Sequence, residues 1–302
     1  MSTIKTKISE DKTLEFLKNS FDPNVQSINF LNGGEMSQAF SFLSKDRHLV
    51  IRFYKESMSF KKDKYAYDHF NSATVPIPQT IELGRVDDTL SFSITTMIKG
   101  KILDEWDTQT RHALLPLEID VLDSLHHSKV EDDKYGWWDD EGHAAYASWQ
   151  ENLYAKKEHV DGDFFKTNKQ HVREKEDIEI VFKKMTELIP KMPNLHYLIH
   201  ADYGGNNLMS DGKKITGVLD FGNSSYGDFL YDVAWLDFWW NELDYKKEFY
   251  NYYAKKGVDL TDFEERILCY QLHMGLGILG FFIMSDQKDK YDYANKRIFG
   301  LF

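Results

Sequence analysis

The sequence predicts an α+β fold in which a β-rich first third precedes a larger, mainly helical remainder. Up to residue 97, short apolar runs alternate with turn residues, whereas from about residue 100 the apolar residues recur at helical spacing. The chain has 302 residues, 42% of them hydrophobic, which is enough for two lobes with a sizeable core. We therefore expect a first lobe at residues 1–97 and a second at residues 98–302.

The first lobe is expected to be a mainly antiparallel sheet with one helix. Strands are predicted at 25–31, 38–44 and 48–55, separated by turn residues. Aromatic residues at helical spacing predict a helix over 59–73, and the two prolines of "VPIPQT" end it. "TIELGRV" and "LSFSITTMI" then form a hairpin around an Asp-Asp pair.

The second lobe is expected to be helical, and "SKVEDDKYGWWDDEGHAA" at 128–145 is expected to be a long loop. The most apolar run, "MGLGILGFFIM" at 274–284, is too short to span a bilayer and predicts a buried helix. Two lobes of different composition favour a ligand site at their boundary. Four runs predict amphipathic or buried helices: "HALLPLEIDVLDSLHH", "KEDIEIVFKKMTELI", "YDVAWLDFWW" and "ERILCYQLHMGLGILGFFIM".

The net charge of −12 resides entirely in the second lobe. Residues 1–97 hold 12 acidic and 12 basic side chains, whereas residues 98–302 hold 37 acidic and 25 basic ones. Such a lobe disfavours nucleic acid and anionic membranes and attracts a cationic small molecule, although acidic surfaces also serve solubility alone. One cysteine and no apolar leader indicate a cytoplasmic protein, which we expect to be a monomer or weak dimer.

The stretch "HADYGGNN" at 200–207, followed by "LDFG", has the residue types of a phosphoryl-transfer site. Asp202 can accept a proton from an attacking hydroxyl, and Asn207 and Asp220 can supply oxygen ligands to Mg²⁺. Two glycines between them let the backbone turn tightly, and Asp220 ends an apolar strand. In phosphoryl transfer, positioning and charge neutralisation outweigh covalent chemistry, which suits this set.

These motifs resemble the catalytic-loop and metal-loop patterns of kinases. "GVLDFGNSSYGDFLYDVA" adds the Gly-Asp and Asp-x-Ala segment of the aminoglycoside phosphotransferase family. Within it the chain resembles hygromycin B phosphotransferases through "GGEMSQAFSF", "HLVIRFYKES", "YAYDHFNSATVPIP" and "LIHADYGGNN", a likeness spanning roughly residues 25–280. The resemblance implies a two-lobed protein-kinase-like fold.

The resemblance also implies roles for individual positions. Asp202 would be the catalytic base, Asn207 and Asp220 would hold Mg²⁺ on the phosphates of ATP or GTP, and His200 would brace the catalytic loop. The nucleotide would lie under the turn that contains Gly33, Gly34 and Ser37, and against the hinge around Met97 and Ile98, from Thr96 to Lys99.

The kinase lysine on the third strand is replaced by Arg52, and the matching helix glutamate by Asp63. A longer cation with a shorter anion can span the same gap, and arginine can bind phosphate; an ordinary surface ion pair is the alternative. Ala201 stands where regulated protein kinases carry arginine, and only "NSSYG" separates "DFG" from "DFLYDVA". The resemblance therefore implies a constitutively active small-molecule kinase.

Several other polar positions have less specific interpretations. Asp228 is expected to be a helix N-cap and structural brace, and His126 and His127 to be structural. The acidic run at 131–141 is either a solvated loop or a lip of the substrate site. The Trp and Phe residues of "LDFWWNELD" are expected in the core, while its acids either bind a polyamine sugar or form a polar helix face: Asp237, Glu242 and Asp244.

The expected function is ATP- and Mg²⁺-dependent phosphorylation of a hydroxyl on a small cationic molecule, foremost an aminoglycoside antibiotic such as hygromycin B, in the manner of a resistance enzyme. A first alternative is a kinase of another metabolite on the same fold: an amino alcohol, a sugar, a homoserine-like acid or a macrolide. A second is a non-catalytic nucleotide-binding module, which the intact set of Asp202, Asn207 and Asp220 disfavours.

Overall fold

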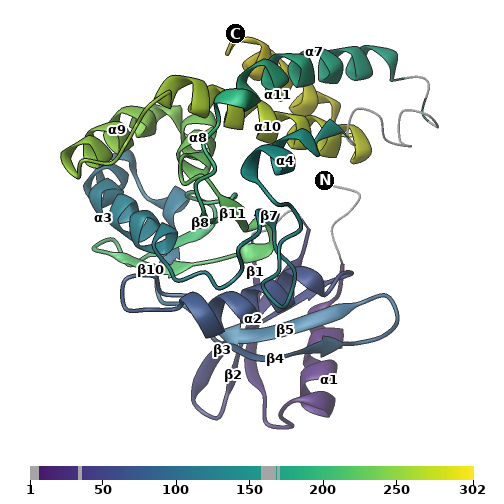
Figure 1. The fold of residues 1–302 in the computed structure, drawn as a ribbon. Coiled ribbons are helices and arrows are strands. Elements are labelled where there is room, and N and C mark those ends of the chain that lie inside the picture. Colours follow the sequence, from purple (N-terminus) through teal and green to yellow (C-terminus); the bar gives the residue numbers. More distant parts are fainter. Residues whose placement is uncertain (1–6, 33–35, 158–167, 169–170) are drawn as a thin grey trace. The chain divides into compact units, whose positions relative to one another are not determined.

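The computed structural model describes residues 7–32, 36–157, 168 and 171–302, and these pack into two compact units (Figure 1). Unit 1 comprises the described residues up to Ser124 together with Asp139–Gly142 and Gly205–Asn223. Unit 2 comprises Leu125–Trp138, the described part of His143–Gly204, and Ser224–Phe302. The expected boundary at residue 97 falls inside unit 1, so the division into residues 1–97 and 98–302 stays a prediction.

Unit 1 is built on a five-stranded antiparallel sheet in the order β1-β2-β3-β5-β4 (Figure 1). The predicted mainly antiparallel sheet, including the hairpin of the last two strands, is therefore confirmed. The strands are β1 Gln26–Leu31, β2 Gln38–Ser44, β3 Arg47–Tyr54, β4 Thr80–Arg85 and β5 Ser91–Thr96.

The two faces of this sheet serve different purposes. Leu49, Ile51 and Phe53 alternate along β3 and are fully buried in an apolar cluster on one face. Since successive side chains of a strand point to opposite faces, Val50 and Arg52 lie on the other face, where they line a pocket. The strand thus places one basic side chain in that pocket and anchors it with an apolar core behind.

Two helices accompany the sheet rather than the single one that the sequence predicted. Helix α1, Glu10–Ser20, begins at Ser9, whose hydroxyl accepts the Lys12 N–H, and packs Leu17 into the apolar cluster. Its eleven residues are largely polar, so the apolar periodicity that reveals a helix is weak there. Helix α2, Met58–Phe70, is the predicted one, and it contacts η3, Phe221–Asn223.

A second, three-stranded sheet completes unit 1 with β6 Lys101–Ile102, β9 Leu208–Ser210 and β10 Ile215–Val218. The hairpin of β9 and β10 carries residue 207 at one end and residue 220 just past the other. Leu219 N–H donates to the Asn207 C=O at 2.9 Å, which ties these ends together. Turn η1, Leu103–Glu105, and helix α3, Thr108–His126, follow β6.

Unit 2 is mainly helical, as the sequence predicts for most of it. Its small sheet joins β7 Gly136–Trp137, β11 Ser225–Gly227 and β8 Tyr197–Ile199. Turn η2 Ile189–Lys191 leads from α7 to β8, and turn η4 Asn241–Leu243 connects α8 to α9. The helices are α4 Trp149–Tyr154, α7 Val172–Leu188, α8 Leu230–Trp239, α9 Tyr245–Lys255, α10 Phe263–Met284 and α11 Lys288–Phe299.

Helix α10 is longer than the apolar run that announced it. It has 22 residues and agrees with the predicted run "ERILCYQLHMGLGILGFFIM", and by length and composition alone the whole helix, unlike the apolar run within it, is enough to cross a membrane. However, 67% of its most apolar window is buried, and it packs against α7, α8 and α11 (Figure 1). This is the environment of the core helix of unit 2, as the buried-helix prediction stated.

Candidate active site

A cavity of about 600 Å³ lies wholly within unit 1, between the residues of its two sheets. The sequence-predicted residues Ser37, Arg52, Asp63, Asn207 and Asp220 all line it. Gly33 and Gly34 lie outside the described residues. Apolar side chains form much of the remaining wall: Ala39, Val50, Ile77, Met97, Ile98, Ile102, Met209, Val218 and Leu219.

The predicted hinge is fixed by backbone hydrogen bonds on both sides. Thr96 N–H donates to the Gln79 C=O at 2.9 Å, and Met97 N–H donates to the His48 C=O at 3.1 Å. The Lys99 C=O accepts the Thr216 hydroxyl at 2.7 Å. Met97 and Ile98 thus border the cavity on a segment that three hydrogen bonds hold in place.

Arg52 and Asp63 form an ion pair, so the longer cation and shorter anion do span the gap between strand and helix. Asp63 also accepts the Phe221 N–H at 2.8 Å, and the Arg52 guanidinium lies 5.0 Å from the centre of the Phe60 ring. Burial lowers the pKa of Arg52, but the Asp63 and Asp220 carboxylates outweigh it and raise the pKa above the usual value. A positive charge is therefore fixed in the cavity.

Asn207 and Asp220 bring two oxygen-bearing side chains to the same cavity. Asp220 has a left-handed backbone, with φ of 63°, and its carboxylate accepts the Gly222 N–H at 3.3 Å. Among the described residues, no group of three or more His, Cys, Asp or Glu side chains could hold a metal. Mg²⁺ suits this site, since it typically takes few protein ligands and completes its shell with phosphate oxygens and water.

Lys62 is a buried lysine, next to Asp63 in the sequence, that the sequence reasoning missed. Its side chain is fully buried, and burial lowers its pKa to about 6, against the opposing effects of Asp63, Asp139 and Asp220. Nothing in the local sequence marks it, because "KKDK" reads as a charged helix surface. Only the packing of segments distant in sequence places acidic groups around it.

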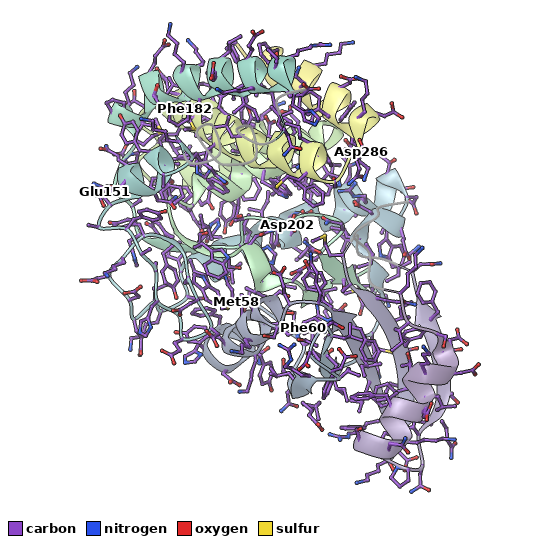
Figure 2. All side chains as sticks on the ribbon, turned by 90° about the vertical axis from the view of Figure 1, so that its right-hand side faces the viewer. Met58, Phe60, Glu151, Phe182, Asp202 and Asp286 are labelled. Atoms are coloured by element: carbon purple, nitrogen blue, oxygen red, sulfur yellow. The ribbon has the colours of Figure 1, made fainter. Side chains whose placement is uncertain are left out.

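Asp202 lies on the loop that follows β8 in unit 2, and its position is labelled in Figure 2. The two preceding peptides are fixed by one fully buried carboxylate: Asp232 accepts the His200 N–H at 2.9 Å and the Ala201 N–H at 2.7 Å. His126 Nε2 lies 2.9 Å from the same carboxylate. Ala201 is held at φ of 61°, so the loop turns sharply just before Asp202.

The buried His200 is linked to this network by its backbone, and its C=O also accepts the Ser224 hydroxyl at 3.4 Å. Asp232 is the residue that the sequence reasoning did not assign, since no local pattern shows that it reaches back 32 residues to the His200 peptide. Between Gly204 and Gly205 the chain passes from unit 2 into unit 1, so Asp202 and the pair of Asn207 and Asp220 belong to different units.

Asp228 is fully buried and accepts four hydrogen bonds within unit 2. Arg266 donates to it twice, at 2.8 and 2.7 Å, Tyr270 donates its hydroxyl at 2.6 Å, and Leu230 N–H donates at 3.0 Å at the start of α8. Burial is the main cause that raises the pKa of Tyr270 well above its ordinary value, so this phenol remains a donor. The contacts are those of a structural brace, but the N-cap residue of α8 is Phe229, so the N-cap prediction for Asp228 was wrong.

The three acidic candidates for substrate binding are spread over α8, η4 and the start of α9. The Asp237 carboxylate accepts from Gln271 Nε2 at 2.9 Å, whereas Glu242 and Asp244 are exposed. Among their aromatic neighbours, Phe238 is buried as expected of the core. Trp239 and Trp240 are only half-buried, so the core prediction was wrong for these two tryptophans.

Comparison with known proteins shows which family this chain belongs to. The family description "phosphotransferase enzyme family" matches residues 27–262. The hygromycin-B 4-O-kinase of Escherichia coli is 27% identical over 298 residues, covering 97% of this chain and 85% of that protein.

Solved structures extend the likeness to the fold. A thermostable mutant of the aminoglycoside phosphotransferase APH(4)-Ia, in ternary complex with AMP-PNP and hygromycin B, matches with a TM-score of 0.83 at 24% identity, over 96% of this chain and 97% of that one. Its apo form matches with a TM-score of 0.81 at 26% identity, over 95% and 97%. The expected α+β, protein-kinase-like fold is thereby confirmed. Since the family match spans well over half of the sequence, this chain is an enzyme that belongs to the phosphotransferase enzyme family.

Proposed function

We propose that this phosphotransferase transfers the γ-phosphoryl group of ATP to a hydroxyl of an aminoglycoside, with hygromycin B as the leading substrate. The observation that carries this proposal is the cavity of unit 1. The Arg52–Asp63 pair, the oxygen-bearing side chains of Asn207 and Asp220, and a set of apolar side chains all line this one cavity. The named relatives, a hygromycin-B 4-O-kinase among them, support the acceptor class.

The nucleotide fits the cavity through separate apolar and charged regions. A purine ring would lie against Val50 and Met209 and beside the hinge at Met97 and Ile98. Backbone groups of the hinge would contact the base, so the side chains there do not indicate whether the nucleotide is ATP or GTP. The phosphates would extend toward Arg52, whose raised pKa keeps it cationic. Asn207 and Asp220 would hold Mg²⁺, which neutralises phosphate charge when bound.

Asp202 would accept the proton of the acceptor hydroxyl as the phosphoryl group transfers. Its loop is prepared for this by the buried Asp232, which fixes the two peptides before it. Such preorganisation matters because the chain contributes chiefly orientation and charge stabilisation to phosphoryl transfer. Arg52 would stabilise the charge that develops on the transferring group.

The charge distribution favours a polycationic acceptor. Residues 98–302 hold 37 acidic and 25 basic side chains, so their field attracts ammonium groups and raises the encounter rate. We further propose that Asp237, Glu242 and Asp244 contribute to this attraction and that the enzyme is a cytoplasmic monomer or weak dimer with a role in antibiotic resistance. Salt weakens long-range steering of this kind.

A substrate panel tests the function directly. ADP release from ATP and Mg²⁺ would be measured with hygromycin B, other aminoglycosides, a macrolide, choline and simple sugars. We expect turnover confined to aminoglycosides and weakened at high salt. Turnover with only a neutral metabolite would contradict the acceptor class while retaining the phosphotransferase chemistry, and Mg²⁺-dependent nucleotide binding without any turnover would favour a non-catalytic module.

Gly204 gives a second test, because its Cα lies directly against an aromatic ring. A Cβ added there would lie 2.1 Å from Trp240 Cη2, so Gly204→Ala must displace the indole or the loop that carries Asp202. We expect kcat to fall about 100-fold, the scale of a 1 Å misplacement near the chemistry. ADP affinity should not change, since the cavity residues lie in unit 1.

Gly300→Ala is the matched control for this substitution. A Cβ at Gly300 would approach backbone oxygens no closer than 3.4 Å, and the position lies at the end of α11. Steady-state kinetics and ADP titration of both variants separate the effects. A Gly204→Ala enzyme with wild-type kcat would show that the contact with Trp240 does not position the loop.

A further inference from the structure

Residues 139–142, here named the strap, pack in a different unit from their neighbours in sequence. Leu125–Trp138 belongs to unit 2, as does the described part of His143–Gly204, whereas Asp139–Gly142 belongs to unit 1. The strap closes on itself as a turn: Glu141 N–H donates to the Asp139 carboxylate at 2.9 Å, and Gly142 N–H donates to the Asp139 C=O at 3.2 Å. It is therefore a short turn of unit 1 with a conformation fixed by its own hydrogen bonds.

The strap contacts one face of α2 through two residues. Lys61 Nζ lies 2.7 Å from Asp140 Oδ2, with the two side chains 42% and 30% exposed. At Gly142, where φ is +82°, an added Cβ would lie 2.2 Å from Tyr65 Oη, so the backbone is pressed against this phenol. Lys61 and Tyr65 are four residues apart and thus share one side of the helix.

The other side of α2 faces the cavity of unit 1, which Asp63 lines. Asp63 holds Arg52 and the Phe221 N–H, and Ser59 Cβ lies 3.2 Å from the position of a Cβ on Gly222. Ser59 and Asp63 are again four residues apart. Helix α2, whose start is marked by Met58 and Phe60 in Figure 2, thus has the strap on one face and the Arg52–Asp63 pair on another.

Lys62 connects these two faces. It lies about 100° around the helix from both Lys61 and Asp63, between the strap side and the cavity side. It is fully buried, and the acidic groups that act on its ammonium come from both sides: Asp139 from the strap, and Asp63 and Asp220 from the cavity. A shift of the strap therefore changes the surroundings of a buried amine whose pKa also depends on Asp63 and Asp220.

We propose that the strap is a positioning element for the nucleotide site. Through Lys61–Asp140 and Tyr65–Gly142 it fixes α2 in the orientation in which Asp63 holds Arg52 toward the phosphates. Half-exposed ion pairs alone contribute little to stability. We therefore assign the Lys61–Asp140 pair a role in orienting α2 and not in stabilising the fold. Because Asp140 is engaged with Lys61, the inference also assigns this part of the acidic run to structure rather than to a substrate lip.

Charge reversal at the strap tests the proposal. The variants are Asp140→Lys, Lys61→Glu and the double exchange, and the readouts are ADP affinity with Mg²⁺ by calorimetry, KM for ATP, kcat and Tm. Each single variant should weaken ADP binding about fivefold, the upper range for such a pair. The double exchange should restore affinity to within about twofold, because it re-forms the pair with opposite polarity.

The matched control lies on the same helix. Lys64 pairs with Asp68 on the exposed surface of α2, and Lys64→Glu makes the same charge change as Lys61→Glu without involving the strap. It should leave ADP affinity unchanged. Gly142→Ala provides an uncharged arm, since its Cβ would collide with Tyr65 Oη, and it should weaken ADP binding in the same direction as the charge reversals.

Three results would overturn the inference. They are unchanged ADP affinity in both single variants, an equal loss in Lys64→Glu, or a loss of Tm without any change in nucleotide affinity or KM. The proposal rests on the proposed nucleotide-dependent function, but its binding readout needs no acceptor. If the wild-type protein binds ADP and phosphorylates no aminoglycoside, the proposed acceptor fails while the strap is still judged on affinity.

Discussion

Replacing Asp202 with asparagine is expected to lower kcat about 1,000-fold while ADP binding remains at the wild-type level. General-base catalysis contributes about 10² to 10⁴ in rate, and the amide of asparagine cannot accept the hydroxyl proton in this way. Asparagine keeps the shape of the side chain, and the peptides before it remain tied to Asp232. The loss should therefore be chemical and not conformational.

Three measurements separate these explanations. Tm and ADP titration should be unchanged, because the cavity of unit 1 contains no atom of Asp202. Asp202→Ala should lose at least as much activity, since it removes the side chain that orients the hydroxyl. Equal Mg²⁺-dependent turnover in wild type and Asp202→Asn would overturn the catalytic assignment, and a large drop in Tm would assign the loss to folding.

The parts of the fold that sequence reasoning predicted are those with a strong local period. β3 alternates buried and half-buried residues from Leu49 to Tyr54, α2 has aromatic residues at helical spacing, and α10 is a long apolar run, so local pattern alone indicated their type. Helix α1 was missed because few of its residues are apolar and its helical state depends on packing Leu17 and Phe16 against the sheet. Helix α10 matches the predicted run "ERILCYQLHMGLGILGFFIM" and begins two residues before it, at Phe263.

The site divides in the same way between local and distant determinants. Asp202, Asn207 and Asp220 lie within 19 residues, so their spacing could be read directly as a motif. Arg52 and Asp63 were paired by their place on a strand and the following helix, and they do form an ion pair. Asp232, Lys62 and the strap were not predicted, because each depends on segments that meet only after folding.

The largest expected effect on stability comes from the buried pair of Arg266 and Asp228. Arg266 is 2% exposed, Asp228 is fully buried, and the guanidinium donates two hydrogen bonds to the carboxylate. Arg266→Met would leave that carboxylate buried without its cation, with only the Tyr270 hydroxyl and the Leu230 N–H as donors. Removing one partner of a buried pair costs about 3–5 kcal/mol, so the free energy of unfolding should fall by that amount.

The double variant Arg266→Met/Asp228→Leu distinguishes two causes of destabilisation: loss of the ion pair, and burial of the Asp228 carboxylate without its cation. It removes both ions, so it should be less destabilised than Arg266→Met, because the desolvation of the unpaired carboxylate disappears. Urea denaturation followed by circular dichroism, with ADP affinity as a check on the cavity of unit 1, would measure both variants. If Arg266→Met stays within about 1 kcal/mol of wild type, Asp228 is not held by this pair and the charge is relieved by protonation or water. If the double variant is the less stable of the two, then the hydrogen bonds that Asp228 accepts from Tyr270 and Leu230 stabilise unit 2 by more than its unpaired buried charge destabilises it.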